Sequence, residues 1–308
     1  MRTSFRAQFF LCNSPDMSSL NMRSPVITIP RLPDFLIVGT MKSGTTTLIR
    51  RLETHPDYAS GLLKEPHFYS DDTVWDKGLE WYRGLFASVP SHQRTAEASV
   101  TYTAPHLARK VVTRIRATNP DAPLVCILRD PVARLRSHYG HQVQRTREKR
   151  PFAVATASPE SDYVKWSMYT ECLTPYRDEI AAGRLLVVRF EDVMGESDTA
   201  WQRILSHVGL APCSCPTGKH NVTAEKLGYT KTMLRLWESG MVEKLKWVPG
   251  PVRRLGKLFL LRNDAAYQTL LEESRALPLA GEVEARLWAD AERLVPLLGL
   301  EKPLWKTP

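Results

Sequence analysis

The sequence predicts an α/β protein in which a parallel, P-loop-like β-sheet is flanked by helices. Short apolar or β-branched runs alternate with longer amphipathic stretches, which is the order that a parallel sheet with crossover helices requires. The first of these runs leads directly into a small-residue turn that opens a helix. With 308 residues, 43% of them hydrophobic, the chain can bury one substantial core.

Four short runs are the predicted strands, and they span residues 35–38, 95–99, 124–128 and 185–190. A turn or a helix opening follows each of them. In an open parallel sheet, ligands bind at the carboxyl ends of the strands. The residues just after each run are therefore the candidates for a functional site.

The turn after the first strand has the character of a phosphate-binding loop. Gly39 and Gly44 allow the backbone to turn tightly and to approach a ligand, and amides at the N-terminus of the next helix point towards an anion. The glycine spacing matches a Walker A loop, but that loop has Lys-Ser/Thr after its second glycine, whereas Thr45 stands here. Lys42 lies inside the turn instead. A turn that only packs a helix onto a sheet is the structural alternative.

A second motif follows the third predicted strand. Asp130 suits an N-cap and Pro131 suits the first position of a helix, so Arg129 stands at the carboxyl end of the strand. Ser137 then lies on the second turn of that helix. An arginine fork and a hydroxyl can hold a terminal phosphate. In the structural alternative, Arg129 only pairs with a carboxylate.

These two motifs resemble the nucleotide loops of sulfotransferases that use 3′-phosphoadenosine 5′-phosphosulfate (PAPS). The resemblance is closest to the heparan sulfate N-sulfotransferase-like, carbohydrate branch, and it extends from about Pro33 to the C-terminus. It implies the sulfotransferase fold. It also implies transfer of a sulfuryl group from PAPS, with no metal ion, to a hydroxyl or amine of a carbohydrate or a glycosylated small molecule.

The resemblance further implies roles for individual residues. Lys42 would meet the bridging oxygen, on which negative charge builds during the transfer. The next four residues would surround the 5′-phosphate, and Arg129 and Ser137 would hold the 3′-phosphate. The expected nucleotide contacts are Lys42, Ser43, Gly44, Thr45, Thr46, Arg129, Ser137 and, in a loose match to the family's late nucleotide loop, Lys219.

The segment 64–69, Lys-Glu-Pro-His-Phe-Tyr, is the predicted source of the general base. The acceptor must lose a proton as it attacks sulfur. In the heparan-type enzymes that this chain resembles, the base is a glutamate three residues before paired aromatics, a place that Glu65 fits. His67 is the rival, because imidazole has the better resting pKa and is the base in the phenol and steroid branch. We favour Glu65; Lys64 would orient the sulfuryl group or pair with Glu65, unless it is simply exposed.

Two features bear on the acceptor. Residues 95–102 resemble the Glu-Lys-Ser-Pro-x-Tyr strand of the family, but Ala98 stands where the lysine would face an acidic substrate. This departure argues against heparan itself. The aromatic-rich stretch 67–86 is expected to pack against the domain, with a sugar-stacking surface as the alternative.

The net charge of +9 favours anionic partners without selecting among them. A nucleotide or small-molecule kinase stays open as a second function, although the chain lacks Lys-Ser/Thr after Gly44 and an obvious strand-end aspartate for Mg²⁺. A third possible function is that of a non-catalytic basic module that binds anionic glycan or nucleic acid. Such a module would need no nucleotide-binding loop. We favour the enzyme, with no nucleic-acid partner; the sequence does not predict an oligomeric state.

The chain is expected to be organised as a mobile tail, residues 1–30, and a single domain, residues 31–308, with a basic, helical C-terminal part. No run approaches the ~20 apolar residues of a membrane span. The cysteines at 12, 126, 172, 213 and 215 form neither a disulfide framework nor a zinc pattern, and Cys126 suits the core. Reduced thiols and a cytoplasmic location are expected. A location in the Golgi lumen would require an anchor that is missing from this chain.

Overall fold

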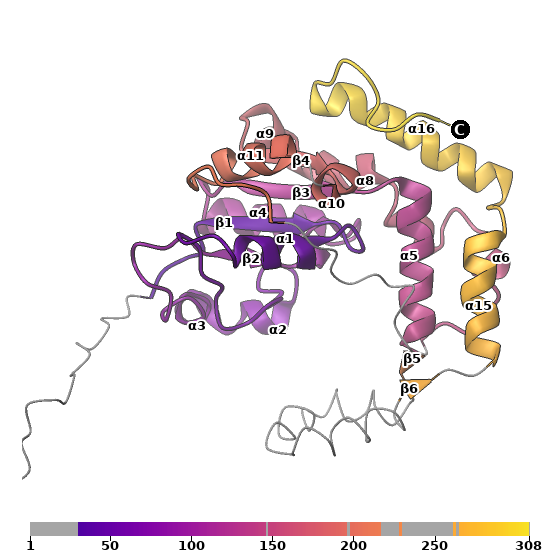
Figure 1. The fold of residues 1–308 in the computed structure, drawn as a ribbon, viewed down its shortest axis with the longest axis horizontal. Helices are drawn as coiled ribbons and strands as arrows, with labels where there is room; N and C mark the ends of the chain where they lie inside the picture. Colours follow the sequence, from indigo (N-terminus) through magenta and orange to yellow (C-terminus); the bar gives the residue numbers. More distant parts are fainter. Residues whose placement is uncertain are drawn as a thin grey trace, which may run out of the picture.

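In the computed structural model, a four-stranded parallel sheet with helices on both faces forms the centre of the protein (Figure 1). The structure describes residues 30–145, 147–195, 198–216, 228–229, 261–262 and 265–307. The described elements are, in chain order, β1 (Phe35–Gly39), α1 (Thr45–Leu52), α2 (Asp72–Trp75), α3 (Gly78–Gly84), β2 (Ala96–Ala98), η1 (Val100–Thr103), α4 (Ala108–Thr118), β3 (Leu124–Leu128), α5 (Pro131–Gln144), α6 (Phe152–Ala155), α7 (Asp162–Lys165), α8 (Tyr169–Leu173), η2 (Thr174–Tyr176), α9 (Arg177–Ala181), β4 (Leu185–Arg189), α10 (Phe190–Met194), α11 (Asp198–His207), β5 (Gly228–Tyr229), β6 (Leu261–Arg262), α15 (Ala265–Ala276) and α16 (Gly281–Leu298).

The strand order β2-β1-β3-β4 contains a reversal between β1 and β3. From β1 the chain crosses to β2 on one side and then returns past β1 to β3 on the other side. In α/β proteins, ligands bind outside the carboxyl ends of the strands at such a reversal. The loops that follow β1 and β3 carry the two predicted nucleotide motifs, so the topology makes these motifs neighbours.

Alternate strand residues face two separate cores. Leu36 and Val38 of β1 pack with α4 and the aromatic stretch, whereas Phe35 and Ile37 pack with α1 and α11. Cys126 of β3 is fully buried in the first core, as predicted. Because the strands are covered on both faces, their sequences read as nearly continuous apolar runs rather than as a polar alternation.

The predicted strands are confirmed, with small differences at their ends. Only Ala96–Ala98 of the predicted run 95–99 forms β2, and Phe190 begins α10 instead of ending β4. The aromatic stretch packs inward, as expected. Phe68 and Tyr82 are buried and their rings are stacked, with centroids 4.0 Å apart.

A third core lies between α5, α6, α7, α15 and α16. Figure 1 shows α5 between the sheet and α15, and α16 also packs on α8 and α9. Beyond α16 the chain returns to the end of β4, where Arg189 donates a hydrogen bond to the Leu304 carbonyl at 3.0 Å. The C-terminal helices are thus in contact with the sheet-bearing part of the chain.

The described cysteines, Cys126, Cys172, Cys213 and Cys215, are free thiols, as expected. None of the helices that the structure describes is long and apolar enough to cross a membrane. Three predicted features lie outside the described residues: the tail apart from Pro30, Cys12 within that tail, and most of the basic stretch from residue 219 to 262.

Candidate active site

The loop between β1 and α1 makes a tight turn that depends on its glycines. Positive φ angles occur at Gly39 (148°), Lys42 (70°) and Gly44 (85°). A Cβ atom at Gly39 would lie 2.3 Å from Oγ1 of Thr103, and one at Gly44 would lie 3.0 Å from the ring of Phe190. Close approach and backbone conformation together require glycine at both positions.

Thr40 and Ser43 fix this loop from within. Both the amide and the hydroxyl of Thr40 donate to the Ile127 carbonyl on β3, at 2.9 and 3.0 Å. Ser43 is fully buried: its amide donates to the Thr40 carbonyl at 3.2 Å, and the two hydroxyl oxygens are 2.6 Å apart. Ser43 therefore shapes the loop, and its contact with a 5′-phosphate stays a prediction. No sequence motif pointed to the role of Thr40.

The N-terminus of α1 is suited to an anion. Thr45 and Thr46 are its first residues, and the first amides of a helix lack carbonyl partners within the helix. The preceding residue, Gly44, supplies no side-chain cap, and no acidic residue lies in the first turn. The helix dipole adds partial positive charge at the same point.

Arg129 brings the second motif into contact with the first. Its guanidinium donates to the Lys42 carbonyl at 3.4 Å and lies 4.5 Å from the ring centre of Phe190. Partial burial lowers the pKa of Arg129, but an arginine remains charged. The negative charges of Glu191 and Asp130 partly offset this lowering. The contact of Arg129 with a 3′-phosphate stays a prediction, and so does the structural alternative of pairing with a carboxylate.

The helix after Arg129 begins as predicted. The Asp130 side chain accepts a hydrogen bond from the Ala133 amide at 2.8 Å, and Pro131 occupies the first turn of α5. Ser137 lies further along α5 and is partly buried. Its contact with a 3′-phosphate stays a prediction. Lys219, the remaining predicted nucleotide contact, lies outside the described residues.

Glu65 lies close to the phosphate loop, although a stretch of chain separates them in sequence. Lys64 makes the connection, because its Nζ donates to Oγ1 of Thr46 at 3.0 Å and lies 4.0 Å from Oε1 of Glu65. The side chain of Glu65 is 29% exposed, so a substrate can reach its carboxylate. A hollow of about 260 Å³ adjoins this contact and is lined in part by Thr46, Arg50 and Lys64.

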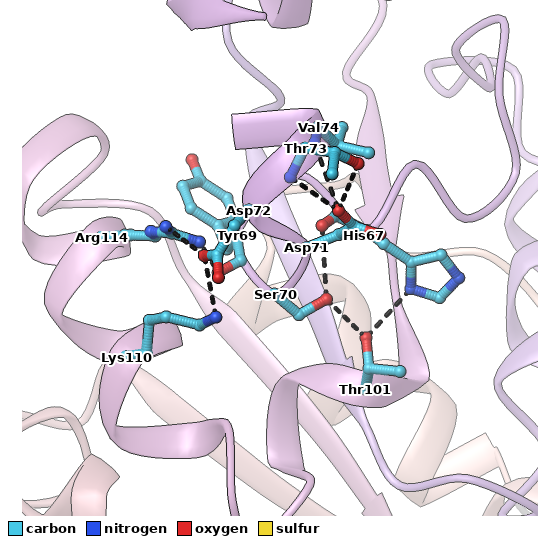
Figure 2. A network of polar contacts seen from close by, with 10 residues as sticks. All are labelled: His67, Tyr69, Ser70, Asp71, Asp72, Thr73, Val74, Thr101, Lys110 and Arg114. Atoms are coloured by element: carbon cyan, nitrogen blue, oxygen red, sulfur yellow. Dashed lines mark hydrogen bonds and ion pairs between the residues drawn. The ribbon is translucent and has the colours of Figure 1, made fainter. Parts of the chain in front are cut away.

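His67 is held on both sides of its ring. Nδ1 lies 2.9 Å from Oγ1 of Thr101, and Nε2 lies 3.8 Å from Oε2 of Glu65. Figure 2 shows the Thr101 hydroxyl between His67 and Ser70. Oγ1 of Thr101 lies 2.7 Å from Oγ of Ser70. The backbone of His67 has a φ of 57°, which a residue with a side chain rarely adopts. These contacts favour an orienting role for His67, and the choice of Glu65 as base stays a prediction.

The segment that carries both residues is also tied to α4. Asp72 accepts hydrogen bonds from Lys110 at 2.8 Å and Arg114 at 2.6 Å, and Arg114 donates to the Tyr69 carbonyl at 3.2 Å (Figure 2). Asp71 caps α2 through the amides of Thr73 and Val74. The segment is therefore attached to the rest of the protein by polar contacts at several points.

Sequence reasoning missed Glu97, a carboxyl group buried beneath this segment. It is 1% exposed and accepts hydrogen bonds from the hydroxyls of Ser99, Tyr82 and Tyr102. Burial raises the pKa of Glu97 to about 7, because the loss of hydration outweighs the three hydroxyl bonds. A signal existed in the sequence: a glutamate between Ala96 and Ala98 in a predicted strand needs polar partners if that strand is buried.

Among the residues that the structure describes, no group of three or more His, Cys, Asp or Glu side chains is arranged to hold a metal ion. Ala98, which replaces the family's lysine, is buried at 5% exposure in the core shared with α1.

The chain is similar in sequence to curated sulfotransferases. Heparan sulfate glucosamine 3-O-sulfotransferase 6 of Mus musculus is 36% identical over 138 residues, which are 43% of this chain and 39% of that protein. Heparan sulfate glucosamine 3-O-sulfotransferase 3B1 of Mus musculus is 30% identical over 188 residues, which are 58% of this chain and 47% of that protein. This chain therefore spans less than half of the length of these relatives.

The fold is shared with a solved structure, and the family is identified by sequence. The sulfotransferase from Alicyclobacillus acidocaldarius superposes with a TM-score of 0.59 at 22% identity, covering 88% of this chain and 98% of that one. The family model described as "Sulfotransferase domain" matches residues 32–221, which is well over half of the chain. Because that match includes both nucleotide motifs and the whole four-stranded sheet, the chain belongs to the sulfotransferase domain family.

Proposed function

We propose that this protein transfers a sulfuryl group from PAPS to a hydroxyl or amine of a carbohydrate or a glycosylated small molecule. The observation that supports it most is the contact of the Arg129 guanidinium with the Lys42 carbonyl. It brings the arginine expected to hold the 3′-phosphate next to the loop expected to hold the 5′-phosphosulfate. One nucleotide with phosphate groups at both positions suits that pair.

The residues around the loop suit this donor. The amides of Thr45 and Thr46, with the dipole of α1, would bind the 5′-phosphate oxygens. The Arg129 fork and the Ser137 hydroxyl would bind the 3′-phosphate. Lys42 would face the bridging oxygen and stabilise the negative charge that develops there. When bound, the donor supplies the activated sulfuryl group.

The chemistry then needs one base. Glu65 would accept the proton of the acceptor as the acceptor oxygen or nitrogen forms its bond to sulfur, while the bond from sulfur to the bridging phosphate oxygen breaks. Lys64 would hold Glu65 near the N-terminus of α1 through its bond to Thr46. His67 would orient Glu65 from the other side.

The nature of the acceptor is part of the proposal. The names of the relatives specify a glucosamine 3-O position in heparan sulfate, which supports a sugar hydroxyl as acceptor. Ala98 still argues against heparan itself, because this position provides no cation for an acidic chain. The family match favours a sulfotransferase over the kinase and the non-catalytic basic module that the sequence left open. We further propose that residues 31–308 act as one domain, located in the cytoplasm or in the Golgi lumen.

The donor prediction is tested by the desulfonated nucleotide, 3′-phosphoadenosine 5′-phosphate (PAP). PAP is expected to stabilise the fold by ~2.7 kcal/mol at a hundredfold excess over its dissociation constant, because it binds only the native state. ATP, which has no 3′-phosphate, is expected to do much less. A thermal-shift titration with PAP, ATP and GTP measures the difference, and equal shifts for PAP and ATP would remove the case for 3′-phosphate recognition.

Arg129→Ala is expected to weaken PAP binding chiefly through the 3′-phosphate. Loss of one charge-assisted contact costs ~1.5–3 kcal/mol, which is roughly 10- to 150-fold in affinity. Binding of adenosine 5′-phosphosulfate, which has a 3′-hydroxyl, should change little. Calorimetric titration of both nucleotides into the parent and the variant separates these effects. An unchanged preference for the 3′-phosphorylated nucleotide would contradict the assigned role.

A further inference from the structure

The buried carboxyl group of Glu97 lies at the centre of a hydrogen-bond arrangement that the proposed chemistry does not use. Its Oε2 accepts from the hydroxyls of Tyr82 and Tyr102, each at 2.7 Å, and its Oε1 accepts from the Ser99 hydroxyl. Its hydrogen-bond partners are thus neutral hydroxyls. A carboxyl group is costly to bury in such surroundings, so its presence calls for a reason beyond packing.

Two of these three hydroxyls also hold the segment that carries Glu65. The Ser99 hydroxyl accepts from the His67 amide at 3.0 Å, and the Tyr102 hydroxyl accepts from the Tyr69 amide at 3.1 Å. A hydroxyl that donates to a carboxylate becomes a better acceptor, since successive hydrogen bonds polarise one another. Glu97 therefore strengthens two bonds to the main chain without touching that chain itself.

The segment has reason to need this support. The φ of 57° at His67 is costly for a residue with a side chain, and it persists only where surrounding contacts fix it. The Glu65 carboxylate, two residues away, is partly exposed, and its ionic neighbours Lys64 and His67 are both on the same segment. The position of Glu65 is therefore set by how firmly the segment backbone is held.

We propose that Glu97 is a positioning residue for the base: through the Ser99 and Tyr102 hydroxyls it fixes the main chain at His67 and Tyr69, and so fixes Glu65 beside the phosphate loop. The raised pKa of Glu97 agrees with a carboxyl group kept in a costly place for such a purpose. This inference rests on the proposed function only for the role of Glu65. The support of the segment is a property of the fold.

The chain offers a matched pair of tyrosines to test it. Tyr82 and Tyr102 donate to the same Oε2 atom at the same distance, but only Tyr102 also accepts a main-chain amide of the segment. Hydrogen–deuterium exchange on the full chain without nucleotide measures how firmly the backbone amides of the segment are held. Tyr102→Phe and Glu97→Gln should speed exchange at residues 67–69 about tenfold, the loss of one hydrogen bond of ordinary net strength. Tyr82→Phe should have a clearly smaller effect.

A second buried carboxyl group controls for general destabilisation. Glu179 is 1% exposed and is paired with Arg116 and Arg184, on α9 and away from the segment. Glu179→Gln should lower overall stability while leaving exchange at residues 67–69 unchanged relative to the rest of the sheet. If Glu179→Gln and Glu97→Gln speed exchange there equally, or if the two tyrosine variants are indistinguishable, the inference is wrong.

Transfer kinetics test the consequence for Glu65. With PAPS and a glucosamine-containing oligosaccharide as the probe acceptor, Glu97→Gln and Tyr102→Phe should lower kcat by roughly 10- to 100-fold, since displacement of a catalytic group by ~1 Å has that effect. PAP affinity should stay within about twofold of the parent. Unchanged kcat in an active parent would overturn the positioning role. A parent that neither binds PAP nor transfers sulfate would overturn the proposed function instead, and the exchange data would then decide this inference alone.

Discussion

Glu65→Gln is expected to lower the rate of sulfuryl transfer by roughly 10² to 10⁴, the contribution of a positioned acid or base, while PAP affinity stays nearly intact. Glutamine keeps the size and packing of Glu65 but cannot accept the proton of the acceptor. The structure sharpens this expectation. The carboxylate is reachable at 29% exposure, and Lys64 connects its segment to the first turn of α1. Single-turnover transfer and nucleotide binding, measured on the same preparation, separate chemistry from donor affinity.

Two control variants decide between the carboxylate and the imidazole. His67→Ala should cost less activity than Glu65→Gln, because the His67 ring is held between Thr101 and Glu65 and, in our proposal, only orients Glu65. Glu80→Gln, the same change at an exposed glutamate on α3, should leave the rate unchanged. If Glu65→Gln turns over near the parent rate while His67→Ala is inactive and still binds PAP, the histidine is the base.

Lys42→Ala is expected to lower the transfer rate by roughly 10² to 10³, the effect of removing one preorganised electrostatic contact from a developing negative charge. The loss should exceed any loss of PAP affinity, because charge on the bridging oxygen grows during the reaction. The φ of 70° at this position strains lysine and alanine alike, so the change removes the ammonium group without adding backbone strain. Single-turnover rates compared with PAP affinities measure the two effects separately.

The Lys42 prediction has its own controls. Lys42→Arg should recover only part of the rate, because a guanidinium fork does not occupy the place of a compact ammonium group. Lys165→Ala, which removes a lysine of α7 paired with Glu160 on the surface, should leave the rate unchanged. Equal losses of rate and of PAP affinity in Lys42→Ala would show that this lysine only binds the donor.

The sequence predicted much of the framework of the site because that framework is local. The cap of α5 by Asp130 and the opening of α1 after Gly44 depend on residues within a few positions of each other, and both are present. The four strands were found from short runs of apolar residues. Their ends differ from the prediction by at most one residue, since the end of a strand depends on where its neighbour stops pairing.

The buried polar groups were harder to predict. In the sequence, Glu97 is a single charged residue in a predicted strand, and the departure from the family pattern lies at its neighbour Ala98. Its partners Tyr82 and Tyr102 come from α3 and η1, on opposite sides of β2 in the sequence. Hydrogen bonds of this kind depend on how α3 and η1 pack around β2, so the spacing of residues along the chain does not predict them.

The sequence by itself determined the two nucleotide motifs, the strands before them and the glycines that the first loop requires, because backbone conformation and helix capping are decided by adjacent residues. The tertiary structure alone decided which of these pieces meet. Arg129 reaches the carbonyl of Lys42 across 87 residues because β1 and β3 are neighbours in the sheet. Lys64 meets Thr46, and Glu97 supports the main chain at His67, because helices and loops from distant segments share the buried surface of one sheet. Such contacts follow from strand order and packing. These depend on burial of the whole hydrophobic core and not on adjacent residues.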